Sequence, residues 1–496
     1  MAEGRAIHRA TMPARWAAAL YRRAGRRDNP AMRDFRQESL SHDPLHGYIP
    51  FTAAEGLPPD ETAEEHVIDH PWVQRLRQIH QLQTAWWVFP TAEHTRFQHV
   101  VGVMHLASRA TEALYDSLRE VCPDVPSRAY VESLLRMTGL LHDVGHGPFG
   151  HFLDDHFLCR HALTHETLGS AIVERELGPL LQGIRRNPRG ALAEGETLDP
   201  RQISYLMRRP QAEGDEAPRW LRFLRSLFCG LYTVDNMDFV LRDAYMTGYA
   251  TRAFDLERLL HYSFFSQSGL TIHARGLPAL ARFVGVRAEL FRSVYFHRTV
   301  RGIDLTLADL FAASGESLFE GNPLERLQEY QRFTEWSLLI DVSRWHESAE
   351  PTRRALGERW RTFLSRRLEW HMAAERTRFF APDESERGSV FSRPEFFEQA
   401  LRELLPAELR DLPLRVDLAR HMHRPGTRGP AAGQNFLYDP ARDQVRPLSD
   451  HELFRQIPLS YRICRVYSLS REHDAALAAA LDALVGPESP DEKTNM

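Results

Sequence analysis

Apolar residues return every three or four positions along most of the first 310 residues, and this periodicity limits the possible folds more than any other feature. It is clear in segments such as PWVQRLRQIHQL and VVGVMHLASRATEALYDSL. This spacing places apolar side chains on one face of an α-helix, and that face must be buried against other helices. We therefore expect a mainly α protein with an all-helical core over residues 37–310. Within it, HGYIPF is typical of a short strand or hairpin beside the core.

The rest of the chain divides by composition and by turn signals. Residues 1–36 carry nine arginines against three acidic residues, which predicts a basic, flexible extension. Residues 311–420 are helical in pattern, richly charged and interrupted by Pro and Gly clusters, so we expect a helical subdomain that forms a second layer. Residues 421–485 change to strand-like segments followed by one helix, which predicts a small α/β lobe. The polar ending, residues 486–496, has the composition of a disordered tail.

The composition narrows the chemistry but leaves the function open. The formal net charge of -5 gives no general attraction to polyanions, so a phosphate site must be a local cluster of cations. Lys493 is the sole lysine, so those cations must be arginines or histidines. The four cysteines are widely spaced, and no apolar run approaches the roughly 20 residues that span a bilayer. We expect a cytoplasmic protein with no membrane segment.

The histidines are concentrated in one part of the sequence. Nine of the 24 lie between His94 and His165. A protein core tolerates imidazoles at this density only where they find partners. Structural histidines that hydrogen-bond within the core are one explanation, and a metal site is the other.

A metal site is favoured by the context of an adjacent His-Asp pair, which follows an apolar helical run and precedes the Gly-rich turn VGHGPFG. An imidazole nitrogen beside a carboxylate oxygen suits a divalent first-row metal. Further donors begin the helix in TRFQHVVGVMHLA and lie in LYTVDNMDFVLRDAYMTG. This donor set does not distinguish Fe, Mn, Zn, Mg and Ni. The predicted metal ligands are His99, His142, Asp143 and Asp235.

These motifs belong to a longer ordered series that resembles the HD-domain superfamily, in particular its deoxynucleoside triphosphate triphosphohydrolases. The series runs through DPLHGYI, WWVFPTAEHTRFQH, LLHDVGHGPFGHFLD, THETLGS, VDNMDFVLRDAYMTG and YFHRTVRGID, over about residues 40–475. The resemblance implies an all-helical HD core and the same four metal ligands. It also implies conversion of a dNTP to a deoxynucleoside and tripolyphosphate, with additional Mg on the triphosphate. We expect no sterile-alpha-motif domain of the kind that the animal enzyme carries.

The resemblance also implies catalytic roles around the metal. His151 resembles the proton donor to the leaving oxygen, and Asp154 resembles its support. His146 and His165 resemble the groups that hold the triphosphate, and Arg96 resembles the arginine beside the attacked phosphorus. Cations and a proton donor are needed there, because charge develops on the equatorial and departing oxygens. The alternative for the three histidines is an ordinary place in turns and helices.

Five residues resemble the nucleoside end of the family's substrate pocket. Gln81 and Leu82 resemble the base and sugar edge, and Asp243 resembles the partner of the 3'-hydroxyl. Tyr295 resembles the ring that packs against the sugar and disfavours a ribose, although an aromatic core residue is its alternative. Arg287 resembles a phosphate clamp.

The sequence departs from the family pattern beside the metal aspartate. Asn236 stands where the animal enzyme's pattern has a lysine for phosphate, and Phe239 stands where it has a tyrosine. The first change removes a cation and the second removes a hydrogen bond to the sugar. Both changes concern contacts to the substrate, so they weaken the assignment of a deoxynucleoside triphosphate more than the assignment of the metal ligands.

The family's regulatory nucleotide site is matched only in part. Asp69, Gln74 and Arg77 resemble its guanine-reading and phosphate-binding side, whereas Ser39 replaces the basic residue expected before DPLHG. The alternative is a helix start with ordinary surface residues. An activating nucleotide and a homo-oligomer, dimer or tetramer, are implied by the resemblance.

The leading hypothesis is thus a metal-dependent dNTP triphosphohydrolase. One alternative is an HD phosphatase or phosphodiesterase that acts on another nucleotide or a short nucleic acid. A second alternative is a nucleotide-sensing or nucleic-acid-binding protein, in which the HD site is structural and the Arg-rich extension binds single strands weakly.

Overall fold

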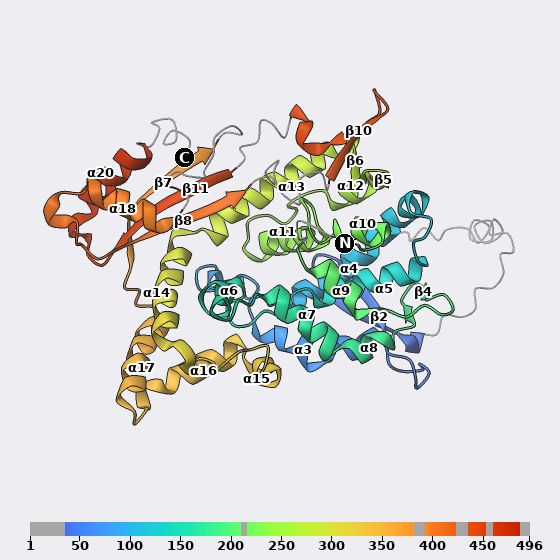
Figure 1. The fold of residues 1–496 in the computed structure, drawn as a ribbon, viewed down its shortest axis with the longest axis horizontal. Coiled ribbons are helices and arrows are strands. Elements are labelled where there is room, and N and C mark those ends of the chain that lie inside the picture. Colours follow the sequence, from blue (N-terminus) through green and yellow to red (C-terminus); the bar gives the residue numbers. More distant parts are fainter. Residues whose placement is uncertain are drawn as a thin grey trace, which may run out of the picture.

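The computed structural model describes residues 35–209, 216–380, 391, 393–422, 435–452 and 460–486. The expected basic extension, except for its last two residues, and the expected tail, except for Gly486, lie outside these residues. The described part is mainly helical, with several small sheets (Figure 1), so the predicted fold class is confirmed. No helix within it is long and apolar enough to cross a membrane.

The helical core is built from elements between residues 38 and 314, and one hydrophobic cluster runs through all of it. Its long central helix is α4 (Arg96–Val121), against which α5 (Arg128–Leu141) and α11 (Val234–Met246) pack. The remaining helices are α2 (Glu64–Ile68), α3 (Pro71–Gln74), α6 (His151–His156), α7 (His165–Arg175), α8 (Gly178–Gln182), α9 (Pro200–Met207), α10 (Arg219–Arg225), α12 (Leu256–His261), α13 (Leu277–Leu290) and α14 (Arg298–Ser314).

The predicted hairpin is present at the edge of this core. Strands β1 (Glu38–Asp43) and β2 (Gly47–Thr52) pair antiparallel through a tight turn, and Gly47 takes a positive φ of 71° there. A second two-stranded sheet joins β3 (Arg186–Asn187) to β4 (Gly190–Ala191). Both hairpins lie against the helices rather than in a separate layer.

Three more helices form the second layer, which lies beside α14 at the lower left of Figure 1. They are α15 (Leu327–Arg332), α16 (Glu335–Arg344) and α17 (Pro351–Leu364). Their buried aromatic side chains belong to the main hydrophobic cluster, with Trp345 and Trp360 almost fully enclosed. The layer therefore extends the core instead of forming a core of its own.

The C-terminal lobe has its own small core, at the upper left of Figure 1. Its three-stranded antiparallel sheet has the order β7 (His371–Phe380), β11 (Ser460–Ser468), β8 (Leu414–Met422). Helices α18 (Pro394–Leu404) and α20 (Asp474–Val485) pack with it. Residues 311–420, expected to be helical throughout, thus contain two strands, because β11 provides hydrogen-bonding partners on both of its edges.

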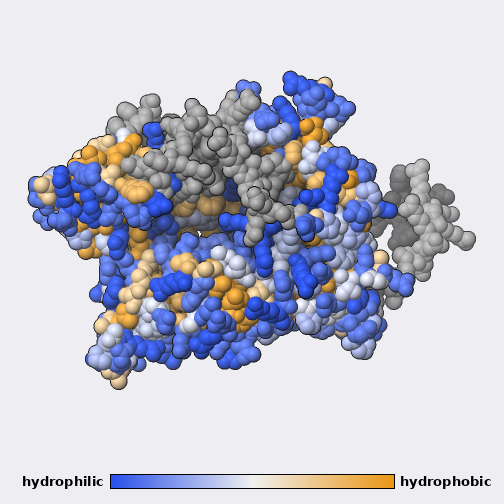
Figure 2. Space-filling view, in the orientation of Figure 1, coloured by the Kyte–Doolittle hydropathy of each residue, from blue (hydrophilic) through white to orange (hydrophobic). Residues whose placement is uncertain are grey.

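One segment of the expected lobe returns to the core. Strands β9 (Asn435–Asp439) and β10 (Gln444–Pro447) join β5 (Ser263–Ser266) and β6 (Gly269–His273) in a four-stranded sheet of order β10-β9-β6-β5. The β6–β9 pair is parallel, which requires the long connection that the chain supplies. The face shown in Figure 2 is mostly hydrophilic, with apolar side chains in separate patches.

Candidate metal centre

Three helix ends of the core bring the first group of functional side chains together. Gln98 accepts a hydrogen bond from the backbone N–H of Thr95 at 2.6 Å, which starts α4 so that His99 lies in its first turn. His142 ends α5, where its Nδ1 lies 2.8 Å from the carbonyl oxygen of Gly139. Asp235 lies in the first turn of α11, at the helix end that favours an acidic side chain.

Their ligand atoms converge on one point. The Nε2 atom of His99 lies 3.1 Å from Oδ1 of Asp235 and 3.3 Å from Nε2 of His142. The distance from His142 Nε2 to Asp235 Oδ1 is 3.7 Å. Two donors that share one ion at about 2.1 Å lie at most about 4 Å apart. His99, His142 and Asp235 therefore fit a divalent cation in donor type and in spacing, and are called the metal trio below.

The electrostatics of the metal trio favour positive charge. Burial opposes a charge on His99, but hydrogen bonds to Asp235 and Asp238 outweigh it and raise the pKa of His99 to about 10. Burial also opposes ionisation of Asp235, yet hydrogen bonds from His142 and His99 hold the pKa of Asp235 well below its ordinary value. A bound cation would supply the charge that this environment favours.

The fourth predicted ligand, Asp143, lies beside the metal trio. Its Oδ1 atom is 3.4 Å from His142 Nε2 and 3.5 Å from His146 Nε2, and its Oδ2 accepts a hydrogen bond from Nη1 of Arg96 at 2.6 Å. Burial opposes ionisation, but His142 and Arg96 hold the pKa of Asp143 well below its ordinary value. Asp143 thus stands between the metal trio and the next cluster, and its role as a ligand stays a prediction.

A second cluster joins four of the five predicted catalytic residues. The ligand atoms of His146, His151, Asp154 and His165 lie within 4.8 Å of one another. Asp154 accepts a hydrogen bond from Nδ1 of His165, and Nδ1 of His151 lies 3.5 Å from the same carboxylate oxygen. The rings of His146 and His165 are stacked with centroids 3.9 Å apart. Arg96, the fifth residue, bridges to this cluster through Asp143.

The members of this cluster differ in exposure and in charge. His151 begins α6 and its side chain is 56% exposed, whereas His146 is buried. Burial and the nearby Arg96 hold the pKa of His146 well below its ordinary value. Burial favours a neutral Asp154, but hydrogen bonds from His151 and His165 outweigh it and lower its pKa to about 2. The cluster therefore pairs one accessible imidazole with an ionised carboxylate.

The Gly-rich turn that carries His146 is held from beneath by a buried arginine. Arg75 donates to the carbonyl oxygen of His146 at 2.5 Å and to that of Phe333 at 2.7 Å. Tyr330 donates to the carbonyl oxygen of Gly145 at 2.9 Å. A Cβ at Gly145 would lie only 2.0 Å from the carbonyl oxygen of His165, so the turn and α7 approach closely because this residue is glycine.

Three of the five residues predicted for the nucleoside end are connected through His94. The Oδ1 atom of Asp243 lies 2.8 Å from Nε2 of His94. Its Oδ2 atom accepts a hydrogen bond from the hydroxyl of Tyr295. The backbone N–H of Gln81 donates to the carbonyl oxygen of His94 at 3.0 Å. Leu82 is buried in the core cluster. The contacts of Asp243 are within the protein, and its role toward a sugar stays a prediction.

Arg287 and the two departures from the family pattern lie on α13 and α11. Arg287 donates to the carbonyl oxygen of Leu231 at 3.0 Å, and burial lowers its pKa to about 10 although Asp235 partly opposes the shift. The backbone N–H of Asn236 is capped by the hydroxyl of Thr233 at 3.0 Å. Phe239 is half-buried against the core cluster. None of these contacts tests the phosphate role predicted for Arg287.

The three residues predicted for a regulatory site also meet. Nε2 of Gln74 donates to Asp69 at 3.4 Å, and Nε of Arg77 donates to Oε1 of Gln74 at 2.8 Å. The guanidinium of Arg77 covers the ring of Phe97 at 3.5 Å from its centroid. Asp69 and Arg77 are exposed, so the group lies at the surface.

Four residues that contact the metal trio or support it were missed by the sequence analysis. The carboxylate of Asp238 lies 2.8 Å from Nδ1 of His99. His46 and Arg242 also contact this carboxylate, and Arg242 forms an ion pair with Asp43 as well. The sequence did contain two signals. Asp238 follows Asp235 by three positions, which places both on one face of α11, and the DPLHG segment carries Asp43 and His46.

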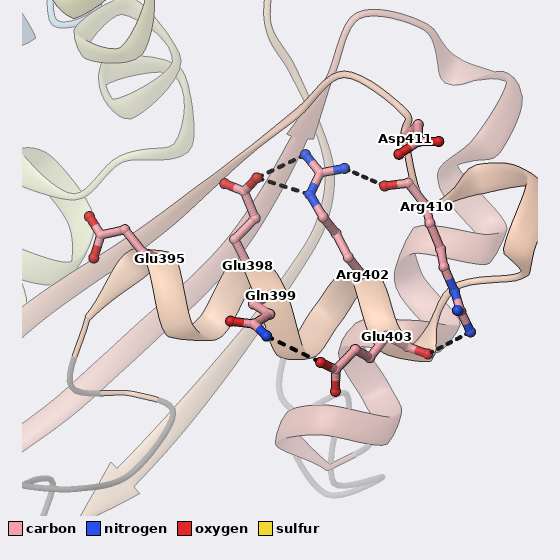
Figure 3. A pocket seen from close by; sticks show the side chains of 7 residues that line it. All are labelled: Glu395, Glu398, Gln399, Arg402, Glu403, Arg410 and Asp411. Carbon is pink, nitrogen blue, oxygen red and sulfur yellow. Dashed lines mark hydrogen bonds and ion pairs between the residues drawn. The ribbon is translucent and has the colours of Figure 1, made fainter.

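A hollow on the C-terminal lobe is lined by charged and polar side chains instead of histidines (Figure 3). Arg402 on α18 is bound twice to Glu398 and also donates to the carbonyl oxygen of Arg410 at 2.6 Å. Arg410 in turn reaches the carbonyl oxygen of Glu403. Because its cations are used within the lobe, this hollow does not compete with the histidine-rich site as the functional centre.

Comparison with known proteins shows a family match for part of the chain that contains the site. Residues 96–215 match the family model of the HD domain. The chain is 25% identical over 391 residues to the uncharacterised protein YwfO of Bacillus subtilis, covering 73% of this chain and 77% of that protein. It is 26% identical over 316 residues to the deoxynucleoside triphosphate triphosphohydrolase SAMHD1 homolog of Dictyostelium discoideum, covering 62% of this chain and 56% of that protein.

A solved structure shows the same fold. The crystal structure of a hypothetical protein from Aquifex aeolicus matches 90% of this chain and 100% of that chain, with a TM-score of 0.63 and 21% sequence identity. At this identity the likeness concerns the fold alone. Residues 96–215 thus match the HD domain, and the sequence relatives together with the metal trio support a metal-dependent HD phosphohydrolase.

Proposed function

We propose that this protein hydrolyses deoxynucleoside triphosphates to a deoxynucleoside and tripolyphosphate. The observation that carries the proposal is the position of Asp143, which lies 3.4 Å from His142 of the metal trio and 3.5 Å from His146 of the second cluster. The carboxylate of Asp143 thus lies between the metal trio, which would hold a cation, and the second cluster, which would bind phosphate and donate a proton. The name of the Dictyostelium relative supports a dNTP as substrate.

A divalent cation held by the metal trio and Asp143 would polarise the α-phosphate and activate a water molecule. The chain's own residues act on the rest of the reaction. Arg96 and the imidazoles of His146 and His165 stabilise the negative charge that develops on the phosphate oxygens. Arg96 is already fixed in place by its hydrogen bond to Asp143.

His151 supplies the proton in this proposal. Attack of the water oxygen on the α-phosphorus breaks the bond to O5', and the departing oxygen takes a proton from His151. The Nδ1 atom of His151 faces Asp154, so Nε2 is the atom that can face the substrate. Asp154 also holds His165 by a hydrogen bond, and one carboxylate therefore orients both imidazoles.

The proposal is tested by incubating the protein with each dNTP in the presence of Mn²⁺ or Mg²⁺. We expect chromatography to show equal amounts of deoxynucleoside and tripolyphosphate, and no release of inorganic phosphate or pyrophosphate. Metal content is measured on the same sample. A metal-loaded protein that forms neither product from any dNTP contradicts the proposal.

Replacement of the proton donor gives a sharper prediction. His151→Gln is expected to lower kcat by about 100- to 10,000-fold, the range for loss of a general acid, and to leave metal content unchanged. The matched control is His156→Gln on the same helix, since His156 packs against Phe152 and lies outside both groups. A His151→Gln protein with the wild-type rate contradicts the assignment of the proton donor.

A second candidate function keeps the metal and changes the substrate. Asn236 and Phe239 remove a phosphate cation and a sugar hydrogen bond from the family pattern, which favours a phosphatase or phosphodiesterase that acts on another nucleotide. The products separate the two candidates, because a phosphatase releases inorganic phosphate and a phosphodiesterase leaves a phosphate monoester, whereas the first candidate releases tripolyphosphate. We propose a homo-oligomer and an activating nucleotide at Asp69, Gln74 and Arg77 as additional features.

A further inference from the structure

A buried carboxylate on α11 connects the metal trio to a distant part of the chain. Asp238 is fully buried, and its Oδ2 atom lies 2.8 Å from Nδ1 of His99. Its Oδ1 atom lies 2.6 Å from Nε2 of His46, whose side chain is only 1% exposed. Arg242, one helical turn further along α11, donates to both oxygens at 2.8 and 2.9 Å. Among the described residues, the hydrogen-bond partners of this carboxylate are all side-chain nitrogen atoms.

The β1–β2 turn is the other end of this chain of contacts. Oδ2 of Asp43 accepts from Nη1 of Arg242 at 2.9 Å, while its Oδ1 accepts from the backbone N–H groups of Leu45 and His46 at 2.8 and 3.0 Å. These bonds fix the turn as an Asx-type turn. Arg242 therefore binds Asp238 and also holds the turn that carries His46.

The approach of these groups to α4 depends on one glycine. A Cβ at Gly102 would lie 2.1 Å from Oδ1 of Asp238 and 2.4 Å from Nη2 of Arg242. Gly102 follows His99 by three positions on α4, so it lies on the same helix face. The sequence therefore leaves room at this position for a carboxylate and a guanidinium beside a metal ligand.

The arrangement fixes which nitrogen of His99 can bind a metal. A carboxylate that faces Nδ1 keeps a hydrogen on that atom, so Nε2, which points at Asp235 and His142, is the nitrogen that offers its lone pair when a cation binds. Partners of this kind orient metal-binding imidazoles and raise their basicity. If His46 were absent, Asp238 would lose one of its donors and could rotate away from His99.

We propose that Asp238 and His46 are positioning residues for His99, and that the β1–β2 turn thereby sets the metal affinity of the centre. The proposal rests on the metal centre of the proposed function but not on its substrate. A turn that only anchors β1 and β2 would affect stability alone. A turn that positions a ligand also affects metal binding.

The test uses Mn²⁺ titration of the metal-free full chain, with free Mn²⁺ followed by electron paramagnetic resonance. His46→Ala is expected to weaken Mn²⁺ binding by about 10- to 100-fold, the range for loss of an outer partner of a metal ligand. His46→Gln places an amide N–H near the position of Nε2 and is expected to restore most of the affinity. The matched control is His42→Ala in the same hairpin, since His42 is exposed and stacks on Tyr48.

Asp238→Asn keeps the size of the side chain and serves as a second variant if His46→Ala does not fold. We expect the same 10- to 100-fold loss, because an amide oxygen is a weaker acceptor than a carboxylate. The thermal midpoint of each metal-free variant is measured in parallel. A lower midpoint with wild-type Mn²⁺ affinity in both His46→Ala and Asp238→Asn overturns the proposal.

The outcome is separable from that of the proposed function. A wild-type protein that binds Mn²⁺ but hydrolyses no dNTP overturns the substrate assignment and leaves the role of His46 intact. A wild-type protein that hydrolyses dNTPs, with Mn²⁺ affinity insensitive to His46→Ala and Asp238→Asn, overturns only the role of the turn.

Discussion

His142→Ala is expected to abolish metal binding at the metal trio and to lower dNTP hydrolysis by more than about 100-fold, the upper end of the loss that an outer partner causes. His142 contributes one of the three donor atoms that lie within 3.7 Å of one another, and alanine offers no replacement. Metal content by mass spectrometry and product formation by chromatography measure the two effects. Wild-type metal content in this variant contradicts the assignment.

The control for this variant is His161→Ala. His161 comes from the same histidine-rich stretch, but it lies against Phe157 and belongs to neither group of converging donors. We expect wild-type metal content and activity. Far-UV circular dichroism on both variants shows whether a loss of metal reflects a loss of fold.

Arg136→Met is expected to destabilise the protein by about 3–5 kcal/mol, since it leaves the carboxylate of Glu64 buried without its cation. Glu64 is fully buried, and Arg136 binds both of its oxygens at 2.5 and 2.7 Å. Arg136 also donates to Ser108 and to the carbonyl oxygen of Pro50, so it joins α2, α4, α5 and β2. The shift is measured by urea unfolding.

A double variant separates the buried charge from the lost contacts. Glu64→Gln combined with Arg136→Met removes both charges and keeps an acceptor for the backbone N–H of Thr52, which Glu64 binds at 3.2 Å. We expect most of the stability to return. Arg128→Met is the surface control, because its pair with Asp116 is exposed and such pairs contribute at most about 1 kcal/mol. A single Arg136→Met variant as stable as that control contradicts the prediction.

The helical core and the metal trio were predictable because their signals are local. The return of apolar residues every three or four positions specifies helix faces, and an apolar run followed by His142 and Asp143 places two donors at a helix end. In the structure His99 and Asp235 lie in the first turns of α4 and α11, whose N-caps are Thr95 and Thr233. Donor type and local context selected His99, His142, Asp143 and Asp235, and the resemblance to the HD family implied the same four residues.

The supports of the site were not predictable from local pattern. His46 and Asp238 are 192 positions apart, and their contact exists because Gly102 admits a carboxylate beside α4 and because the β1–β2 turn reaches that point. The place of Asp143 between two clusters likewise depends on how the Gly-rich turn packs against α7. The spacing of Asp235 and Asp238 indicates that both lie on one face of α11, but no spacing in the chain indicates that His46 reaches that face.

The sequence by itself thus determined the helical class and the residues whose donor atoms converge at the metal trio. Tertiary structure alone decided which carboxylate orients His99, that β9 joins the core sheet through β6, and that β7 and β8 are strands. The physical reason is the range of the interactions. Periodicity and capping act within a few residues, whereas buried charge networks and sheet edges find their partners only after the chain has folded.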